Sequence, residues 1–192
     1  MSNVASRDSV SRVLFSQEDI HRRVEKLGRQ IAQDYSVHNV GRDEQKRPIV
    51  LICVLRGAFM LLADLAREIR IPLQYDFICV SSYGNGTSPG AVRFVKDLEL
   101  PIRGRDVVII EDIVDTGNTL DYLLRVFSAR EPASIRVCAL IDKPVRRVVD
   151  VNVDYAGFTL ESDEFVIGYG MDYAEMYRNL PYIGVLDPDN LP

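Results

Sequence analysis

One stretch decides the fold: Val107-Val108-Ile109-Ile110-Glu111-Asp112-Ile113-Val114-Asp115-Thr116-Gly117-Asn118-Thr119-Leu120. It opens with four apolar β-branched residues, which is typical of a strand buried on both faces of a parallel sheet. Two adjacent carboxylates end that run, and a turn rich in Asp, Thr and Gly comes after them. Leu120, Leu123, Leu124 and Phe127 then recur at helical spacing. The stretch therefore predicts a buried strand, a tight turn and a helix in series.

The turn, Asp115 to Thr119, is typical of a phosphate-binding site. Backbone N–H groups at a helix start bind phosphate, and threonine hydroxyls add donors. Gly117 allows close approach of the backbone or a positive φ. The alternative, an acidic turn with a threonine helix cap, is disfavoured by the Glu111-Asp112 pair before it. The chain has neither a GxxxxGK motif with Ser or Thr next, nor a GxGxxG motif, which argues against Walker and dinucleotide loops.

The same region predicts a bound cation. Glu111, Asp112 and Asp115 would converge beside the phosphate and repel it unless a cation intervenes. Oxygen ligands from carboxylates and phosphates suit Mg²⁺. We therefore expect Mg²⁺ together with a sugar-phosphate ligand.

Working outward, other apolar runs predict further strands, at Ile49–Leu55, Leu73–Ser82, Ala91–Lys96, Ile135–Ile141, Tyr155–Leu160 and Glu164–Gly168. Helical stripes are expected at Ile20, Val24, Leu27 and Ile31, after a start at Ser16 and Asp19, and at Phe59, Leu62, Ala63, Ala66 and Ile69. This alternation predicts a parallel α/β sheet.

The carboxyl ends of parallel strands are where such sheets bind ligands. Chemistry is therefore expected at Arg56-Gly57, at Glu111 to Thr119 and at Asp142-Lys143. Arg146-Arg147 is interpreted as a solvated turn or a subunit contact. The segment Tyr83 to Gly90 has three glycines and no aliphatic side chain, so we expect a flexible loop that serves as a lid.

Composition narrows the classes of function. A chain of 192 residues predicts one domain. A net charge of −5 disfavours nucleic acid as the main ligand. The three cysteines, Cys53, Cys79 and Cys138, are widely spaced and are expected to be small buried side chains rather than disulfides or zinc ligands. The apolar runs are too short to span a bilayer, so we expect a cytoplasmic protein with no membrane partner.

Several motifs occur together in order along the chain and carry a family resemblance. Val107 to Leu120 resembles the phosphoribosyl-pyrophosphate (PRPP) signature of the type I phosphoribosyltransferases. The other motifs are similar to those of the hypoxanthine-guanine phosphoribosyltransferases: Cys53 to Ala58, Ser82-Tyr83, Leu140 to Lys143 and Phe165 to Tyr173. The resemblance implies a single domain over 1–192, with a mostly parallel central sheet flanked by helices. A small hood would come from about residues 1–15 and 150–192, and the protein would be a homodimer or homotetramer.

The resemblance also implies a reaction: transfer of phosphoribosyl from PRPP to N9 of hypoxanthine or guanine, giving IMP or GMP plus pyrophosphate, with Mg²⁺. It implies a general base at Asp115 and a loop for the 5′-phosphate at Asp115, Thr116, Gly117, Asn118 and Thr119. Glu111 and Asp112 would hold the ribose hydroxyls, partly through metal. Pyrophosphate would contact Arg56, Gly57, Ser82, Tyr83 and Arg178. In the loop Leu55-Arg56-Gly57 the family often has a non-proline cis peptide. The purine would contact Lys143, Phe165, Val166 and Asp172, and the metal carboxylates would be Glu111, Asp112 and Asp172.

Two alternatives remain open at this point. One is a sister enzyme that prefers xanthine. The other is a regulator of the same fold that senses PRPP and controls transcription. The acidic charge and the lack of a spare helix-turn-helix segment weigh against the regulator.

Overall fold

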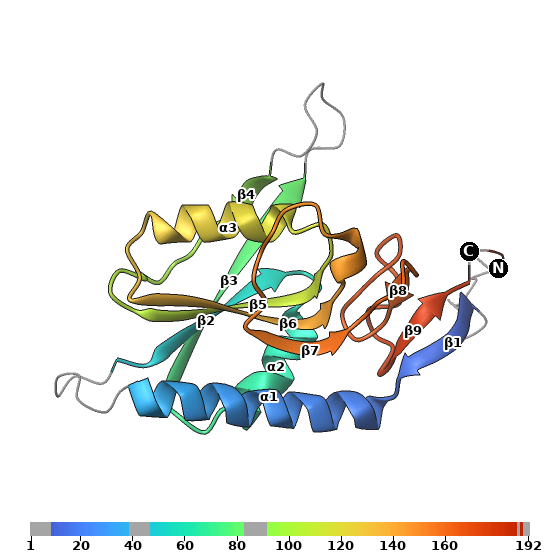
Figure 1. The fold of residues 1–192 in the computed structure, drawn as a ribbon, viewed down its shortest axis with the longest axis horizontal. Helices are drawn as coiled ribbons and strands as arrows, with labels where there is room; N and C mark the ends of the chain where they lie inside the picture. Colours follow the sequence, from blue (N-terminus) through green and yellow to red (C-terminus); the bar gives the residue numbers. More distant parts are fainter. Residues whose placement is uncertain (1–8, 39–46, 83–91, 188, 190–192) are drawn as a thin grey trace.

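The computed structural model describes residues 9–38, 47–82, 92–187 and 189. Its central element is a six-stranded sheet in the order β4-β3-β2-β5-β6-β7 (Figure 1). The strands are β2 (Ile49–Leu55), β3 (Leu73–Ser82), β4 (Val92–Lys96), β5 (Asp106–Val114), β6 (Ser134–Asp142) and β7 (Tyr155–Thr159). All neighbours are parallel except β3 and β4, which are antiparallel. The predicted mostly parallel sheet is confirmed, and β2 and β3 have the predicted bounds.

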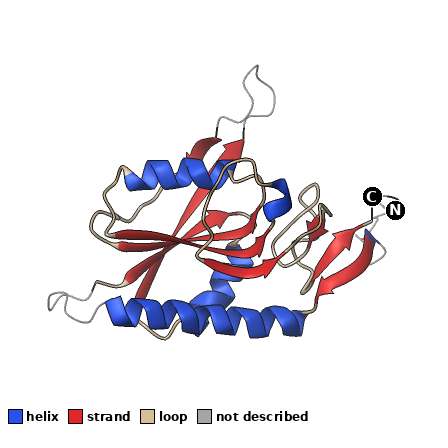
Figure 2. Ribbon diagram, in the orientation of Figure 1, coloured by secondary structure: helices blue, strands red, loops and turns tan. Residues whose placement is uncertain are grey.

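Helices cover both faces of this sheet (Figure 2). α1 (Gln17–His38) and α2 (Phe59–Glu68) lie on one face, and α3 (Asn118–Ser128) lies on the other. Each face has its own apolar cluster, because alternate side chains of the buried strands point to opposite sides. The sheet is thus the middle layer of three.

The predicted stripe of α1 is confirmed. Ile20, Val24, Leu27 and Ile31 are all at most 2% exposed. The helix start is also as expected: the Ser16 hydroxyl accepts from the Asp19 N–H at 3.2 Å, and the Asp19 carboxylate accepts from the Ser16 N–H at 3.1 Å. This reciprocal pair satisfies two N–H groups that helix geometry leaves without partners.

The predicted stripe of α2 is wrong in part. Phe59 is 39% exposed and Ala63 is also exposed. Leu62 and Ile69 are buried as predicted, and the buried face also carries Leu61 and Leu65. It is rotated because burying the leucines removes more apolar surface from water than burying alanines does.

A second, three-stranded antiparallel sheet lies beside the first. It contains β1 (Val10–Phe15), β9 (Ile183–Leu186) and β8 (Val166–Ile167), in that order. β1 and β9 come from opposite ends of the chain, and Figure 1 shows them side by side. Neither strand was predicted, since each is stabilised by a partner more than 160 residues away, from Val10↔Leu186 to Phe15↔Ile183.

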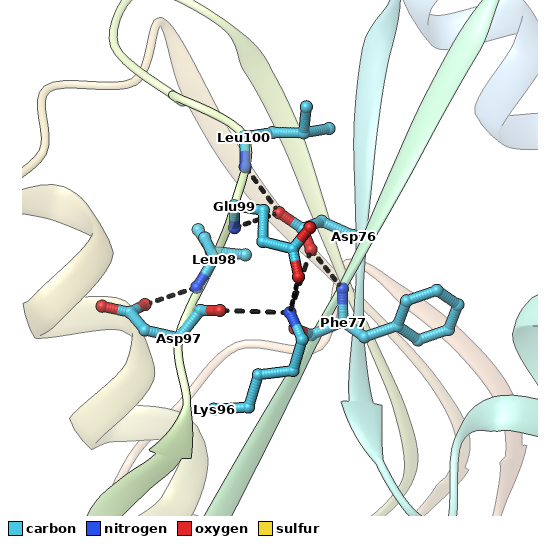
Figure 3. A network of polar contacts seen from close by, with 7 residues as sticks. All are labelled: Asp76, Phe77, Lys96, Asp97, Leu98, Glu99 and Leu100. Atoms are coloured by element: carbon cyan, nitrogen blue, oxygen red, sulfur yellow. Dashed lines mark hydrogen bonds and ion pairs between the residues drawn. The ribbon is translucent and has the colours of Figure 1, made fainter.

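A buried acid fixes the β3 side of the large sheet (Figure 3). Asp76, on β3, is 5% exposed. Its carboxylate accepts from the backbone N–H groups of Phe77 (2.7 Å), Glu99 (2.7 Å) and Leu100 (2.8 Å). Lys96, at the end of β4, places its ammonium 3.7 Å away. This network, called the Asp76 network below, joins β3 to the connection between β4 and β5.

None of the helices in the described ranges is long and apolar enough to cross a membrane. Cys53 and Cys138 are buried as predicted, whereas Cys79 is only partly buried. All three are free thiols.

Candidate active site

Glu111 and Asp112 lie near the carboxyl end of the central strand β5. The strand continues to Val114, so the two acids are within it rather than after it. Successive side chains of a strand point to opposite faces. Glu111 accordingly lines a small cavity of about 90 Å³ together with Asp115, whereas Asp112 lies against Gly57. The sequence predicted that the three carboxylates converge. In the structure, Glu111 and Asp115 lie on one side of the strand and Asp112 lies on the other.

The Arg56-Gly57 loop follows β2, as predicted, and packs directly on Asp112. A Cβ atom added to Gly57 would lie 1.6 Å from Asp112 Oδ2. A Cβ added to Gly170 would lie 2.0 Å from the Gly57 carbonyl oxygen. The Leu55–Arg56 peptide is cis. Glycine is therefore required at both positions by close approach of other parts of the site.

Asp172 and Arg178 lie on the same side as Asp112. Arg178 donates to Asp172 at 2.8 Å and to the Gly170 carbonyl at 2.7 Å. Both side chains are close enough to influence Asp112: Arg178 lowers its pKa and Asp172 raises it. Glu175, paired with Arg56 at 2.8 Å, completes this charged group. The structure thus brings together the residues predicted to bind metal and pyrophosphate on this side.

The charged forms of Glu111 and Asp112 are disfavoured at the end of β5. Burial raises the pKa of Glu111 well above its ordinary value, and the nearby Asp112 carboxylate raises it further. Burial also raises the pKa of Asp112. The N–H of Ile113, which donates to the Asp112 carboxylate at 2.9 Å, lowers this pKa by less. A bound cation would remove this penalty.

The turn after β5 leads directly into α3, as the sequence predicts. Gly117 has φ = +88° and is the residue that caps the helix. The Thr116 hydroxyl accepts from the Asn118 amide at 3.2 Å. Asp115 Oδ1 is buried with no hydrogen-bond partner among the described residues, and Arg146 Nε lies 3.5 Å from it. This oxygen therefore has room to accept a hydrogen bond from a ligand.

Lys143, at the end of β6, is buried, with 3% of its surface exposed, so it is not a solvated lysine. Its ammonium donates to the Glu164 carbonyl at 2.8 Å and lies 3.3 Å from Asp163. The neighbouring Phe165 is 51% exposed, which leaves much of its surface open, and it meets Tyr173 edge-on. Val166 begins β8 and is buried. These residues thus place one cation beside one exposed aromatic side chain.

The interpretation of Arg146-Arg147 as a solvated turn is wrong for Arg147. Only 16% of its side chain is exposed, and it donates to the carbonyls of Val114, Asp115 and Val151. The signal for it was its place just after the end of β6, at the same sheet edge as the turn that opens α3. Arg146, 45% exposed, contacts Asp115 and Asp163.

Other predictions are only partly covered. Ser82 is the last residue of β3, and the predicted lid, Tyr83 to Gly90, lies outside the described residues. Within the described ranges, no group of three or more His, Cys, Asp or Glu side chains forms a ready metal cage. A larger cavity of about 610 Å³ lies elsewhere, between α1, α2 and residues 179–181.

Known proteins are similar to this chain over most of its length. The model of the phosphoribosyl transferase domain family matches residues 16–174. The chain belongs to the phosphoribosyltransferase family. It is 47% identical over 173 residues to a hypoxanthine phosphoribosyltransferase of Salmonella typhimurium, covering 90% of this chain and 93% of the relative. It is 48% identical over 182 residues to a hypoxanthine-guanine phosphoribosyltransferase of Mycobacterium avium, covering 93% and 87%.

A solved structure agrees with the family assignment. A hypoxanthine phosphoribosyltransferase from Staphylococcus aureus superimposes with a TM-score of 0.87 at 40% identity, covering 98% of each chain. The type I phosphoribosyltransferase fold is therefore confirmed for this chain. The chain is accordingly a phosphoribosyltransferase.

Proposed function

We propose that this phosphoribosyltransferase transfers the phosphoribosyl group of PRPP to N9 of hypoxanthine or guanine, giving IMP or GMP and pyrophosphate. One observation carries the proposal. An acid pair, a helix-opening turn and a buried lysine lie at the ends of β5 and β6, which are adjacent parallel strands. The names of the relatives support the same substrates.

In this proposal the 5′-phosphate and the pyrophosphate of PRPP bind on opposite sides of β5. The nest at Asp115 to Thr119 would hold the 5′-phosphate, because helix N-termini present N–H groups to anions. Arg56, Gly57 and Arg178 would hold the pyrophosphate on the Asp112 side, with Ser82 and Tyr83 as further contacts. Glu111 and Asp112 would then lie between these groups, at the ribose hydroxyls.

Mg²⁺ fits the acids present. Burial raises the pKa of Asp112, and Asp172 is close enough to raise it further. Mg²⁺ usually takes one or two carboxylates and completes its shell with water and substrate phosphates, so a full protein cage is not needed. Asp112 and Asp172 would hold it on their side of the strand, and Glu111, on the other side, would contact a ribose hydroxyl. When bound, it neutralises charge on the departing pyrophosphate.

The purine would be recognised by residues of the turn after β5, the end of β6 and the segment around β8. Asp115 would take the purine proton as the bond to N9 forms, since its Oδ1 has no hydrogen-bond partner among the described residues. Lys143 would donate to the exocyclic O6. Phe165 would stack on the ring, the backbone at Val166 would meet its edge, and Asp172 would lie nearby.

We also propose an assignment for the small sheet. β8 begins one residue after Phe165, so the sheet β1-β9-β8 would be the hood that covers the purine, with the whole chain as one domain. We further propose a homodimer or homotetramer, for which the exposed apolar side chains of Tyr75 (57%) and Val95 (63%) offer a contact surface. A cytoplasmic location is a separate part of the proposal. Light scattering of the purified protein measures the oligomeric state.

Steady-state kinetics with hypoxanthine, guanine, xanthine and adenine test the proposal. Adenine presents an amino donor where the other three present an oxygen, and a donor facing the Lys143 ammonium is strongly rejected. We expect kcat/KM for adenine to be at least about 10²-fold below that for hypoxanthine. Turnover of xanthine above the other purines, or no turnover with PRPP, would overturn the proposal.

A lysine pair serves as the matched comparison for specificity. Lys143→Gln should narrow the gap between adenine and hypoxanthine, because an amide can accept as well as donate. Lys96→Gln removes a lysine of the Asp76 network, remote from the site, and should leave that ratio unchanged. An equal effect of both substitutions would show that Lys143 does not read the purine.

A further inference from the structure

Arg147 makes an unusual set of contacts for a residue outside the predicted site. Its Nε donates to the Asp115 carbonyl at 3.0 Å, Nη1 donates to Val151 at 3.0 Å and Nη2 donates to Val114 at 3.3 Å. Nη2 also pairs with the carboxylate of Asp142. One guanidinium therefore connects the end of β5, the end of β6 and the segment beyond.

Backbone groups of the same segment continue this pattern. The N–H groups of Val148 and Val149 donate to the Thr116 carbonyl at 2.9 and 3.1 Å. The N–H of Lys143 donates to the Val114 carbonyl at 3.0 Å. Three consecutive carbonyls, from Val114 to Thr116, are thus all fixed by residues 143–149.

Fixing these carbonyls also fixes the direction of the next N–H groups. In a trans peptide the C=O of one residue and the N–H of the following residue point in opposite directions. The N–H groups of Asp115, Thr116 and Gly117 must therefore point away from Arg147. The cavity of about 90 Å³ is lined by residues between Glu111 and Leu120 and by none from 143–151, so it lies on that other side.

The contact is also tightly packed. A Cβ added to Gly117 would lie 2.7 Å from the Val149 carbonyl oxygen and 3.1 Å from Arg147 Cδ. The loop has little room to shift toward the segment that holds it. Without the guanidinium, the carbonyls of Asp115 and Val151 would lose this donor and the Val114 carbonyl would keep only the Lys143 N–H, so the loop would be held less firmly.

We propose that Arg147 is a positioning residue, which holds the loop Asp115 to Thr119 in the form that binds the 5′-phosphate of a phosphoribosyl ligand. Arg147 acts from behind the loop and does not touch the ligand. The inference rests on the proposed function, and it adds a residue that neither the resemblance nor the motif pattern assigned. Arginine suits the role because its planar group presents several donors in fixed directions, whereas lysine offers one compact ammonium.

The test compares Arg147→Met, Arg147→Lys and Arg105→Met. Arg105 is the matched control: it is partly buried and donates to the Pro48 carbonyl at 2.6 Å, but it precedes β5, at the end of the strand opposite to the nest. The measurements are KM for PRPP, KM for hypoxanthine at saturating PRPP, kcat and melting temperature.

Arg147→Met should raise KM for PRPP at least about tenfold and change KM for hypoxanthine by less than about threefold. Arg147→Lys should remain within about threefold of the methionine variant, because charge without the fork does not hold three carbonyls. Arg105→Met should lower the melting temperature and leave KM for PRPP unchanged. If Arg147→Met does not fold, the lysine variant alone decides, with a rise in KM for PRPP of at least about threefold as the supporting result.

Other results overturn the inference. Rescue by lysine would show a simple attraction of charge for phosphate. Equal effects of Arg147→Met and Arg105→Met on KM for PRPP would show general destabilisation. An unchanged KM for PRPP, in an enzyme whose wild type makes IMP, removes the inference and leaves the proposed function standing. A wild type that makes no IMP removes both.

Discussion

Asp76 and Glu111 are buried to nearly the same degree, 5% and 7% exposed, on the two strands that flank β2. Burial raises the pKa of Asp76, but the N–H groups of Leu100, Phe77 and Glu99 together with the Lys96 ammonium lower it by more, so the net shift is downward. Burial raises the pKa of Glu111 well above its ordinary value, and Asp112 adds to the rise. The same chemical group is stabilised by the fold in one place and penalised in the other.

The difference separates a structural acid from a functional one. In the Asp76 network the protein supplies the donors that a buried carboxylate needs. At the end of β5 the fold leaves the acids with their penalty, which is reasonable only where a ligand supplies the compensating charge. Substitutions in the two regions should therefore act on different properties, stability in one and turnover in the other.

The largest effect is expected at the functional end, from Asp115→Asn. The substitution removes the proposed general base while keeping the shape of the side chain. We expect kcat to fall by about 10–10³-fold, the usual contribution of a general base, with PRPP binding and melting temperature close to wild type. Steady-state kinetics and a thermal melt measure this. A kcat within twofold of wild type would exclude Asp115 as the base.

Asp76→Asn should show the reverse pattern. The amide would turn a donor toward the N–H of Phe77 or toward those of Glu99 and Leu100, so buried donors would face each other. We expect a loss of about 2–3 kcal/mol in the free energy of unfolding, the scale of hydrogen bonds to a charged group, and kcat within twofold of wild type. Urea denaturation beside a turnover assay measures both. A large loss of kcat in a stable Asp76→Asn protein would contradict the division.

The pH dependence of stability should differ in sign between the two acids. The pKa of Asp76 is lowered by folding, so its contribution is present above the unfolded pKa and is lost as the pH falls through the folded pKa. The pKa of Glu111 is raised by folding, so stability is lost as the pH rises from the unfolded toward the folded pKa. Unfolding free energies of wild type, Asp76→Asn and Glu111→Gln across the acid range, without metal, separate the two slopes. Parallel pH profiles for the two variants would show that the acids are alike.

The sequence predicted much of this arrangement because local patterns dictated it. β2 and β3 were bounded correctly by their apolar runs, and the turn that opens α3 was evident from Asp115 and Gly117. What it did not predict depends on contacts distant in the chain. The small sheet pairs β1 and β9 from distant parts of the chain, and the buried face of α2 depends on what packs against it. Two of the three backbone donors to Asp76 are more than 20 residues away.

Arg147 shows the same limit at the site itself. In the sequence it is one of two adjacent arginines after a proline, a pattern typical of an exposed turn. Its role becomes visible only when β5 and β6 are adjacent, which places it behind the loop that begins at Asp115. A residue such as Arg147, which supports a site from behind, can therefore be recognised only in the structure. The residues proposed to contact the ligand lie in motifs that can be recognised in the sequence.

The central claim is that the fold compensates Asp76 and leaves Glu111 to the ligand. The most direct test is the free energy of unfolding at pH 8 in metal-free buffer for wild type, Asp76→Asn and Glu111→Gln. The account predicts that Asp76→Asn is less stable than wild type and that Glu111→Gln is equally or more stable, because it removes an uncompensated buried charge. A Glu111→Gln protein that loses as much stability as Asp76→Asn would contradict the claim and make Glu111 a structural acid.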